Sequence, residues 1–139
     1  MENKTVMSIE TVIDYIEANL DGKLDLEMVA EAVHYSKYHL HRMFTSTVGM
    51  TIHDYVQRRQ LTEAAKLLAF SDRPIIEVAF ICGYESQQAF SSAFKSMYKI
   101  PPAEYRDNRE FYPLQLRFAL HRNVANKVFT KDDICLAEK

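Results

Sequence analysis

An internal repeat limits the folds open to this chain more than any other feature of its sequence. Seven positions recur at an offset of 49 or 50 residues: Val29, Ala30 and Tyr35 as Val78, Ala79 and Tyr84, then Ser36, Leu40, Phe44 and Tyr55 as Ser86, Phe90, Phe94 and Tyr105. One residue inserted in the second copy accounts for the change of offset. Two short helices joined by a tight turn, with apolar residues on both sides of the turn, are the sequence form of a helix-turn-helix. The sequence therefore predicts two such units.

Helix-capping residues divide the chain into six predicted helices. The caps are Ser8, Asp25, Ser36 and Thr51; Pro74 lies in the first turn of the fifth helix, and the sixth helix begins at Ser86. Between the caps, apolar residues recur every three or four positions, as on the inner face of a helix. We expect the first unit over residues 26–48 and the second over 74–98, separated by a connecting helix over 52–70 that is about 27 Å long. The predicted fold is all-α, with two helix-turn-helix subdomains joined by a long helix.

Length and composition fit this architecture. The chain has 139 residues, of which 47% are hydrophobic and 26% charged, with only three Gly, and this is typical of a globular, helix-rich protein. No apolar run is suited to a secretion signal or a membrane span, so we expect a cytoplasmic protein. Cys82 and Cys135 are far apart and form no C-x-x-C pair. We therefore expect reduced thiols, and neither a disulfide nor a zinc site.

Charge is distributed unevenly along the chain. The net charge is −2, yet residues 1–33 hold two basic and eight acidic side chains, whereas residues 34–109 hold ten basic and seven acidic ones. Such a gradient is compatible with a basic face and an acidic end turned away from it. Taken alone, it is weak support for nucleic-acid binding.

The third and sixth predicted helices each have an outward face rich in hydrogen-bonding groups. A helical wheel places Leu40, Met43, Phe44 and Thr47 on the inner side of the third helix, and Phe90, Ala93, Phe94 and Met97 on that of the sixth. The outward sets are Tyr38, His41, Arg42 and Thr45 in the third helix, and Gln88, Ser91, Ser92 and Lys95 in the sixth, with Gln87 at its start. Arg pairs with guanine, Gln pairs with adenine, and an aromatic ring packs on a thymine methyl group. Both helices are therefore predicted to enter a DNA major groove.

The distance between the two units favours one DNA site for both. Adjacent major-groove segments on one face of B-DNA lie about 34 Å apart. The connecting helix and the width of the units reach this separation within one chain, so no second molecule is needed.

These motifs resemble the DNA-binding domain of the AraC family of bacterial transcription regulators, most closely its stand-alone MarA, SoxS and Rob branch. The resemblance covers residues 8–108 and rests on YSKYHLHRMF, GMTIHDYVQRRQLTEAAKLL and GYESQQAFSSAFKSMYKIPPAEYR. In the last segment, G-[FY]-x-S-Q-x-x-F-x-x-x-F-K and P-x-x-Y-R form the family's frame. The resemblance implies an all-helical, homeodomain-like monomer that binds promoter DNA and recruits RNA polymerase, often as an activator.

The resemblance also implies which side chains read bases. They are Tyr38, His41 and Arg42 in the third helix, and Gln87, Gln88, Ser91 and Ser92 in the sixth. Lys37, Thr45 and Lys95 are candidates for contacts with phosphate groups.

Some positions depart from the family pattern. His34 stands where the second turn has Gly83, so a histidine must adopt a left-handed backbone conformation. Tyr38 replaces a usual Trp, His41 a usual Gln, and Ser92 a longer basic side chain. The preferred DNA sequence therefore cannot be transferred from relatives.

The sequence offers no support for catalysis or for metal binding. It contains no Gly-rich phosphate loop, no H-E-x-x-H and no G-x-S-x-G motif. His39 and His41 are two positions apart on a helix and point to different sides, so one metal ion cannot easily bind both. We expect no enzyme activity, no metal and no cofactor.

Residues 110–139 form a C-terminal extension whose role is open. Leu114, Leu116, Phe118 and Leu120 alternate there with Gln115, Arg117, Ala119 and His121, which is the period of a strand. The extension could pack on the helical body, pair with a second chain, or be the remnant of an effector domain, and packing or pairing is favoured. Pairing leads to an alternative function, a protein-interaction module that titrates or modulates another regulator and binds DNA weakly.

Overall fold

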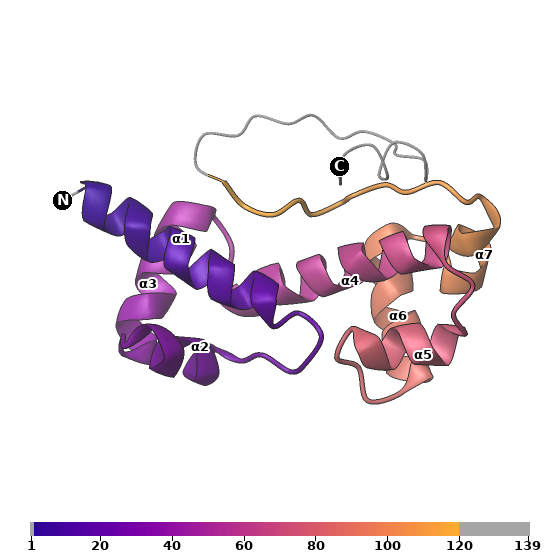
Figure 1. Ribbon diagram of the computed structural model, residues 1–139, viewed down its shortest axis with the longest axis horizontal. Helices are drawn as coiled ribbons and strands as arrows, with labels where there is room; N and C mark the ends of the chain where they lie inside the picture. The colour runs from indigo at the N-terminus through magenta and orange to yellow at the C-terminus, as the bar shows by residue number, and fades with distance from the viewer. Residues whose placement is uncertain (1, 120–139) are drawn as a thin grey trace.

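Figure 1 shows an elongated helical molecule built around one long helix. The computed structural model describes residues 2–119, with side chains from residue 8 onward. The helices are α1 (Glu2–Ala18), α2 (Leu26–Val33), α3 (Lys37–Val48), α4 (Ile52–Phe70), α5 (Ile75–Ile81), α6 (Gln87–Tyr98) and α7 (Pro102–Asp107). Helices α1 to α3 lie at one end of α4, and α5 to α7 lie at the other (Figure 1). Within residues 2–119, no helix is both long enough and apolar enough to cross a bilayer.

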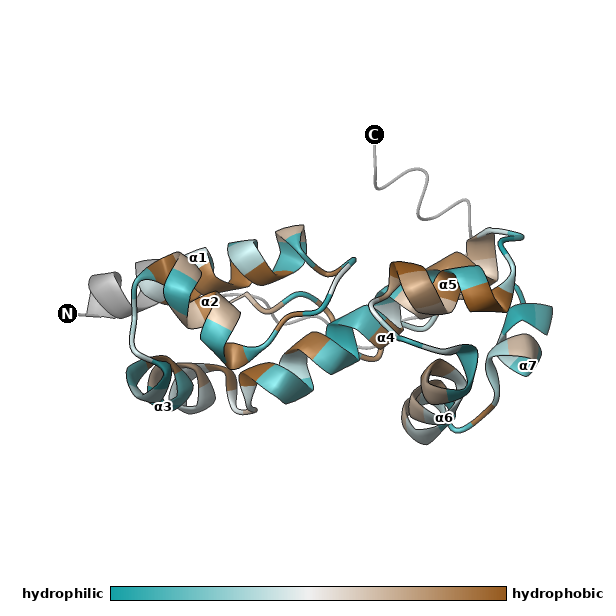
Figure 2. Ribbon diagram, turned by 90° about the horizontal axis from the view of Figure 1, so that it is seen from below, coloured by the Kyte–Doolittle hydropathy of each residue, from teal (hydrophilic) through white to brown (hydrophobic). Residues whose placement is uncertain are grey.

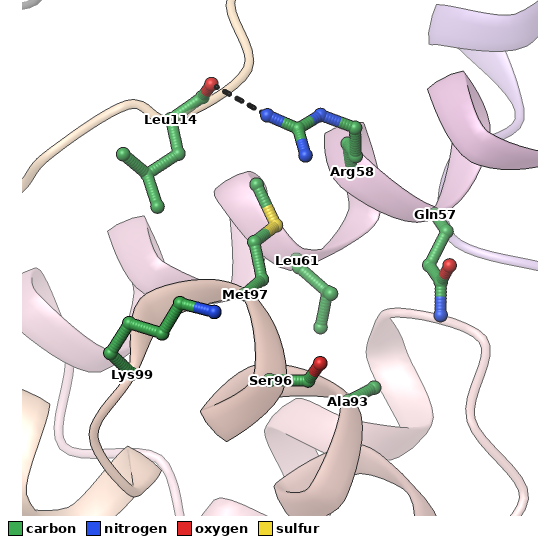
Figure 3. Close-up of a pocket in the computed structure, with 8 residues that line it drawn as sticks. All are labelled: Gln57, Arg58, Leu61, Ala93, Ser96, Met97, Lys99 and Leu114. Atoms are coloured by element: carbon green, nitrogen blue, oxygen red, sulfur yellow. Dashed lines mark hydrogen bonds between the residues drawn. The ribbon is translucent and has the colours of Figure 1, made fainter. Parts of the chain in front are cut away.

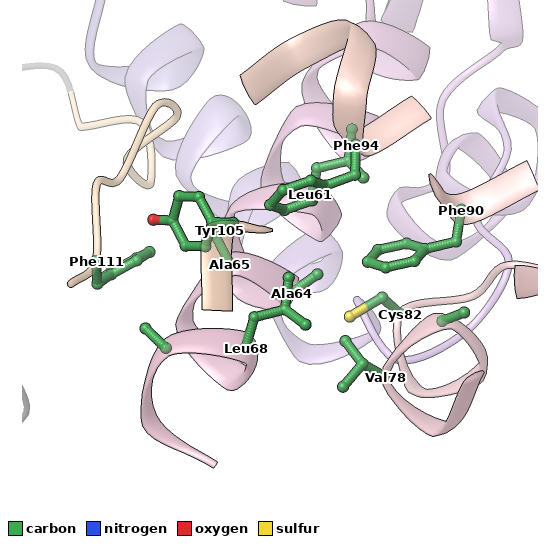
Figure 4. Packing of buried hydrophobic residues seen from close by; sticks show 12 residues of the cluster. Leu61, Ala64, Ala65, Leu68, Val78, Cys82, Phe90, Phe94, Tyr105 and Phe111 are labelled. Carbon is green, nitrogen blue, oxygen red and sulfur yellow. The ribbon is translucent and has the colours of Figure 1, made fainter. Parts of the chain in front are cut away.

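Helix α4 contributes to two separate hydrophobic cores. Near its start, Tyr55 and Val56 are buried together with residues of α1, α2 and α3 such as Phe44. From Leu61 onward it is buried against α5, α6 and α7, where Phe94 is one of its neighbours (Figure 4). The predicted all-α fold, with two helix-turn-helix units joined by a long helix, is confirmed.

Two predictions about the ends of helices are wrong. Helix α1 begins at Glu2, so Ser8 lies inside the helix and does not cap it; its hydroxyl instead forms a hydrogen bond with the hydroxyl of Tyr35. Pro74 is the residue that precedes α5 and not part of its first turn.

Helix α7 was not predicted, because a helix of only six residues after two prolines is too short to show an apolar period.

The other three predicted caps form as expected, and Ser86 is a fourth cap that was not predicted. The side chains of Asp25, Ser36, Thr51 and Ser86 each accept a hydrogen bond from a backbone N–H in the first turn of α2, α3, α4 and α6. These bonds satisfy donors that a helix leaves unpaired at its start. They fix where each of the four helices begins.

The two helix-turn-helix turns follow the same backbone path. His34 has a φ of 62° and Gly83 a φ of 86°, and both are left-handed. In each turn the N–H of the next residue, Tyr35 or Tyr84, donates to the carbonyl five residues earlier, at 2.9 and 3.0 Å. This is the bond that ends many helices at a left-handed residue. The prediction that a histidine takes this conformation is confirmed.

After α7 the chain returns along α4 as an extended segment, and we call residues 111–118 the strap (Figure 1). Phe111 is buried in the second core, and Phe118 packs against the first. Residues 111–118 include a single bridge residue, Phe111, and no β-strand, and both ends of the strap pack on the helical body. Leu120, His121 and Cys135 lie outside the described residues.

We expect His34→Gly to increase the free energy of unfolding by about 0.5 to 1 kcal/mol. A left-handed residue with a Cβ costs about 1 to 2 kcal/mol, and the greater freedom of Gly in the unfolded chain cancels about 0.5 to 1 kcal/mol of the gain. Urea unfolding followed by circular dichroism measures the change.

The matched control is Gly83→Ala in the second turn. A Cβ at Gly83 would lie 2.9 Å from the Gly22 carbonyl oxygen, so this variant should be less stable than the parent. A loss of stability in His34→Gly would contradict the assignment of backbone strain to the first turn.

Candidate nucleic-acid interface

Helices α3 and α6, the second helices of the two units, are presented on one side of the molecule. Both run across its long axis in Figure 1, and in Figure 2 both lie along the same edge. They are joined by α4, whose 19 residues make a rod of about 28 Å. A surface that meets one of these helices can therefore meet the other as well.

Helix α3 has a buried side and an exposed side. Leu40 and Phe44 are fully buried, whereas His41 and Arg42 are exposed and Tyr38 is 72% exposed. The Arg42 guanidinium carbon lies 5.5 Å from the centre of the Tyr38 ring, a cation–π contact. This contact favours a conformation in which the guanidinium stays on the exposed side beside an aromatic ring.

Helix α6 repeats this arrangement with different chemistry. Phe90 and Phe94 are fully buried. The predicted readers Gln87, Gln88 and Ser92 and the predicted phosphate contact Lys95 are exposed, and Ser91 is half-buried. The exposed side of α6 thus offers amides, a hydroxyl and an ammonium group.

The two helices carry no carboxylate. Neither KYHLHRMFTSTV nor QQAFSSAFKSMY contains Asp or Glu. Lys37, at the start of α3, is exposed and lies 3.6 Å from Glu27 of α2, a weak surface pair. Exposed donors and cations without neighbouring acidic groups on the same helix suit a polyanion with acceptor groups.

Thr45 is the predicted contact that the structure places least favourably. The helical wheel puts it on the outward side of α3, whereas the structure half-buries it. Its hydroxyl oxygen is buried and has no hydrogen-bond partner among the described residues. A contact between this hydroxyl and phosphate requires the side chain to rotate.

The sequence reasoning missed a set of polar residues on α4 that connects the two halves of the interface. Arg59 is only 7% exposed. It donates two hydrogen bonds to Glu17 of α1, at 2.8 and 2.7 Å, and one to the Gln115 carbonyl of the strap, at 2.8 Å. Burial opposes its charged form, but the bonds and charge of Glu17 outweigh burial and raise the pKa of Arg59. Arg59 lies within the polar run QRRQ of α4, so the sequence alone does not distinguish it from its exposed neighbour Arg58.

Metal binding and thiol chemistry have requirements that can be compared with the described residues. No cluster of three or more His, Cys, Asp or Glu within residues 2–119 is arranged to bind a metal ion. Cys82 is buried, and burial raises the pKa of its thiol to about 12, so it stays protonated at neutral pH. Its interpretation as a small buried apolar residue is confirmed.

Comparison with known proteins identifies similar chains. A family described as "helix-turn-helix domain" matches residues 29–108. The multiple antibiotic resistance protein MarA of Escherichia coli is 38% identical over 118 residues, which cover 81% of this chain and 93% of MarA. The regulatory protein SoxS of Salmonella typhimurium is 38% identical over 98 residues, covering 70% of this chain and 92% of SoxS. The DNA-binding domain of AdpA, solved in complex with a target DNA, superposes with a TM-score of 0.68 at 27% identity, covering 71% of this chain and 89% of that one.

We expect the exposed residues of α3 and α6 to be dispensable for folding. Tyr38→Ala and Gln88→Ala should each change the free energy of unfolding by less than about 0.5 kcal/mol, because neither side chain is buried. The control Leu40→Ala should lower it by about 2 to 5 kcal/mol, since Leu40 is fully buried in the first core. Chemical denaturation measures all three. A large loss in Tyr38→Ala or Gln88→Ala would mean that these residues serve the fold.

Proposed function

The chain belongs to the AraC-type helix-turn-helix family of DNA-binding transcription regulators, and from this premise we propose that one molecule places α3 and α6 in two adjacent major-groove segments of a promoter. The observation that carries the proposal is the exposure of Arg42 and Gln88 on two helices that lie on the same side of α4. A rod of about 28 Å and the width of the units approach the roughly 34 Å between such segments. If α3 and α6 lie closer than this, the DNA bends at a cost of a few kcal/mol.

Each predicted contact residue is assigned a role by its chemistry. Arg42 pairs with a guanine through the O6 and N7 acceptors, and Tyr38 beside it packs against a thymine methyl group or a sugar. Gln88 pairs with an adenine, and Gln87, Ser91, Ser92 and His41 accept or donate at neighbouring base edges. Lys37, Thr45 and Lys95 contact phosphate groups, which fix the register of the protein on the duplex.

We infer further that the protein acts as a monomer on DNA and activates transcription through contact with RNA polymerase. A single chain supplies both reading helices, so occupancy of the site needs no second copy. The strap lies on its own helices, so this part of the extension is not free to pair with another chain. Family membership supports the proposal of polymerase contact and of activation.

The alternative of a protein-interaction module with weak DNA binding is not favoured. That alternative requires degenerate reading surfaces, whereas α3 and α6 keep exposed Arg, Gln and Lys side chains and lack carboxylates. Binding of the isolated chain to DNA separates the two functions.

The direct test is selection of preferred sites from a random duplex pool by the full chain at stated salt. We expect one non-palindromic site with two short conserved segments about one helical turn apart. Because phosphate contacts release counterions, affinity should fall linearly with salt on a double logarithmic plot. Recovery of no preferred site, together with equal affinity for all sequences, would refute the proposal.

We expect two substitutions to affect binding to the selected site in different ways. Arg42→Ala should cost about 1 to 3 kcal/mol and relax the preference at one base pair, whereas Lys95→Ala should weaken binding to all sequences evenly and reduce the salt dependence. Titration of labelled specific and random duplexes at several salt concentrations measures both. An equal loss on specific and random DNA for Arg42→Ala would remove it from the base-reading set.

A further inference from the structure

Direct contact between the two helix-turn-helix units is limited. In the described part of the chain, extensive packing between helices occurs within one unit or involves α4. The units also meet through two loops, where Lys23 pairs with Glu85 and Gly22 approaches Gly83 closely beside Gln60. The amide of Gln60 donates to the Gly22 carbonyl at 2.8 Å. These loops meet on one side of α4 (Figure 1), so they alone would allow the units to rock about it.

The strap crosses the same junction on the other side of α4 (Figure 1). At its start, Phe111 is 5% exposed and its ring packs against Phe70 in the second core. At its end, Phe118 packs against the first core, and its N–H donates to the Tyr55 hydroxyl at 3.0 Å. Each end of the strap is therefore held by a different unit.

Between these ends, the strap is held by polar side chains of α4. The Thr62 hydroxyl accepts a hydrogen bond from the Gln115 N–H at 3.1 Å, and Arg59 donates to the Gln115 carbonyl at 2.8 Å. Arg58 donates to the Gln115 side chain at 2.9 Å and to the Leu114 carbonyl at 3.5 Å (Figure 3). Side chains of α4 thus satisfy backbone groups of Leu114 and Gln115 in the middle of the strap.

The residues that hold the strap share one face of α4, because the spacings between Tyr55, Arg59 and Thr62 are four and three residues. Through Arg59 this face also reaches Glu17 of α1. The Tyr55 hydroxyl adds a long bond to Glu17, at 3.4 Å. Rotation of one unit relative to the other would break several of these buried bonds together, and breaking buried bonds is costly.

We propose that Tyr55, Arg59 and Thr62 are positioning residues that use the strap to fix α3 relative to α6, and so set the spacing between half-sites that the protein accepts. The consequence for DNA rests on the proposed function. The strap lies beyond residue 108, where the match to the family model ends. When the two units are held together on both sides of α4, the protein should bind only a narrow range of half-site spacings. When they are held on one side only, it should accept a wider range.

The first experiment measures spacing selectivity with the full chain. The variant Tyr55→Phe/Thr62→Val removes the two hydroxyls that hold the Phe118 and Gln115 N–H groups and keeps side-chain volume. Its affinity is compared with the parent on the selected site and on the same site with one base pair added or removed between half-sites. We expect the ratio of these affinities to fall by about fivefold or more, the lower range for energetic coupling between two sites.

The matched control is Tyr98→Phe. The Tyr98 hydroxyl donates to the Tyr112 carbonyl at 2.6 Å and accepts from the Leu114 N–H, so its hydrogen bonds to the strap come from α6, in the second unit. Spacing selectivity should therefore stay at the parent value in this control. A merely destabilising loss of a buried hydroxyl would affect both variants alike.

The second experiment does not depend on DNA. Nitroxide labels at Ser46→Cys and Ser96→Cys, two exposed and equivalent positions of α3 and α6, report the distance between the helices by pulsed electron spin resonance. Cys135→Ser removes one competing thiol, and Cys82 is buried and protonated. The distance distribution should be narrow in the parent and in Tyr98→Phe, and broad in Tyr55→Phe/Thr62→Val.

If the double variant fails to fold, Phe118→Ala releases the strap from the first core without any change in α4, and the same broadening is expected. A narrow, unchanged distribution in a folded variant with a released strap overturns the proposal. If the variants broaden the distance distribution but the parent binds no DNA, the positioning role is supported and the proposed function is refuted. Broadening with unchanged spacing selectivity overturns the claim that the strap sets specificity.

Discussion

The structure depends on one helix that is buried at both ends in different hydrophobic cores. The first part of α4 completes the core formed with α1, α2 and α3, and its later part completes the core formed with α5, α6 and α7. A helix exposed between two domains would be free to bend or fray, but α4 is surrounded along most of its length. The same apolar burial that stabilises each unit therefore keeps α3 and α6 at opposite ends of one helix, and moving either unit along α4 would disrupt packing.

The uneven charge of the chain has a structural explanation in the same region. Two acidic residues of α1 point to basic partners that lie far away in sequence: Asp14 pairs with Arg117 of the strap, and Glu17 pairs with Arg59 of α4. These pairs lie along α4 and the strap and leave the exposed sides of α3 and α6 free of carboxylates. An acidic first helix and a net charge of −2 are thus compatible with binding to a polyanion.

The repeat and the capping residues predicted most of the fold because both are local signals. The exposed sides of α3 and α6 were predictable for the same reason, since an alternation of apolar and polar residues at helical spacing defines two faces. The burial of Thr45 was not predicted, because a helical wheel describes one helix by itself and does not include tertiary packing. The strap was ambiguous, since alternating residues suit a strand as well as an extended segment on a helical surface. Its anchors on α4 join residues more than fifty positions apart, and a single sequence contains no signal for such pairs.

The exposed sides of α3 and α6 are not alike: α3 offers an aromatic ring, an imidazole and a guanidinium, whereas α6 offers amides, hydroxyls and an ammonium group. Because the two ends of the molecule differ, its complex with a DNA duplex has a defined direction along that duplex. Inverting a binding site on a chromosome would then turn the whole protein around, so that a different flank faces the start of the gene. Orientation as well as position of the site becomes part of the information that such a regulator reads.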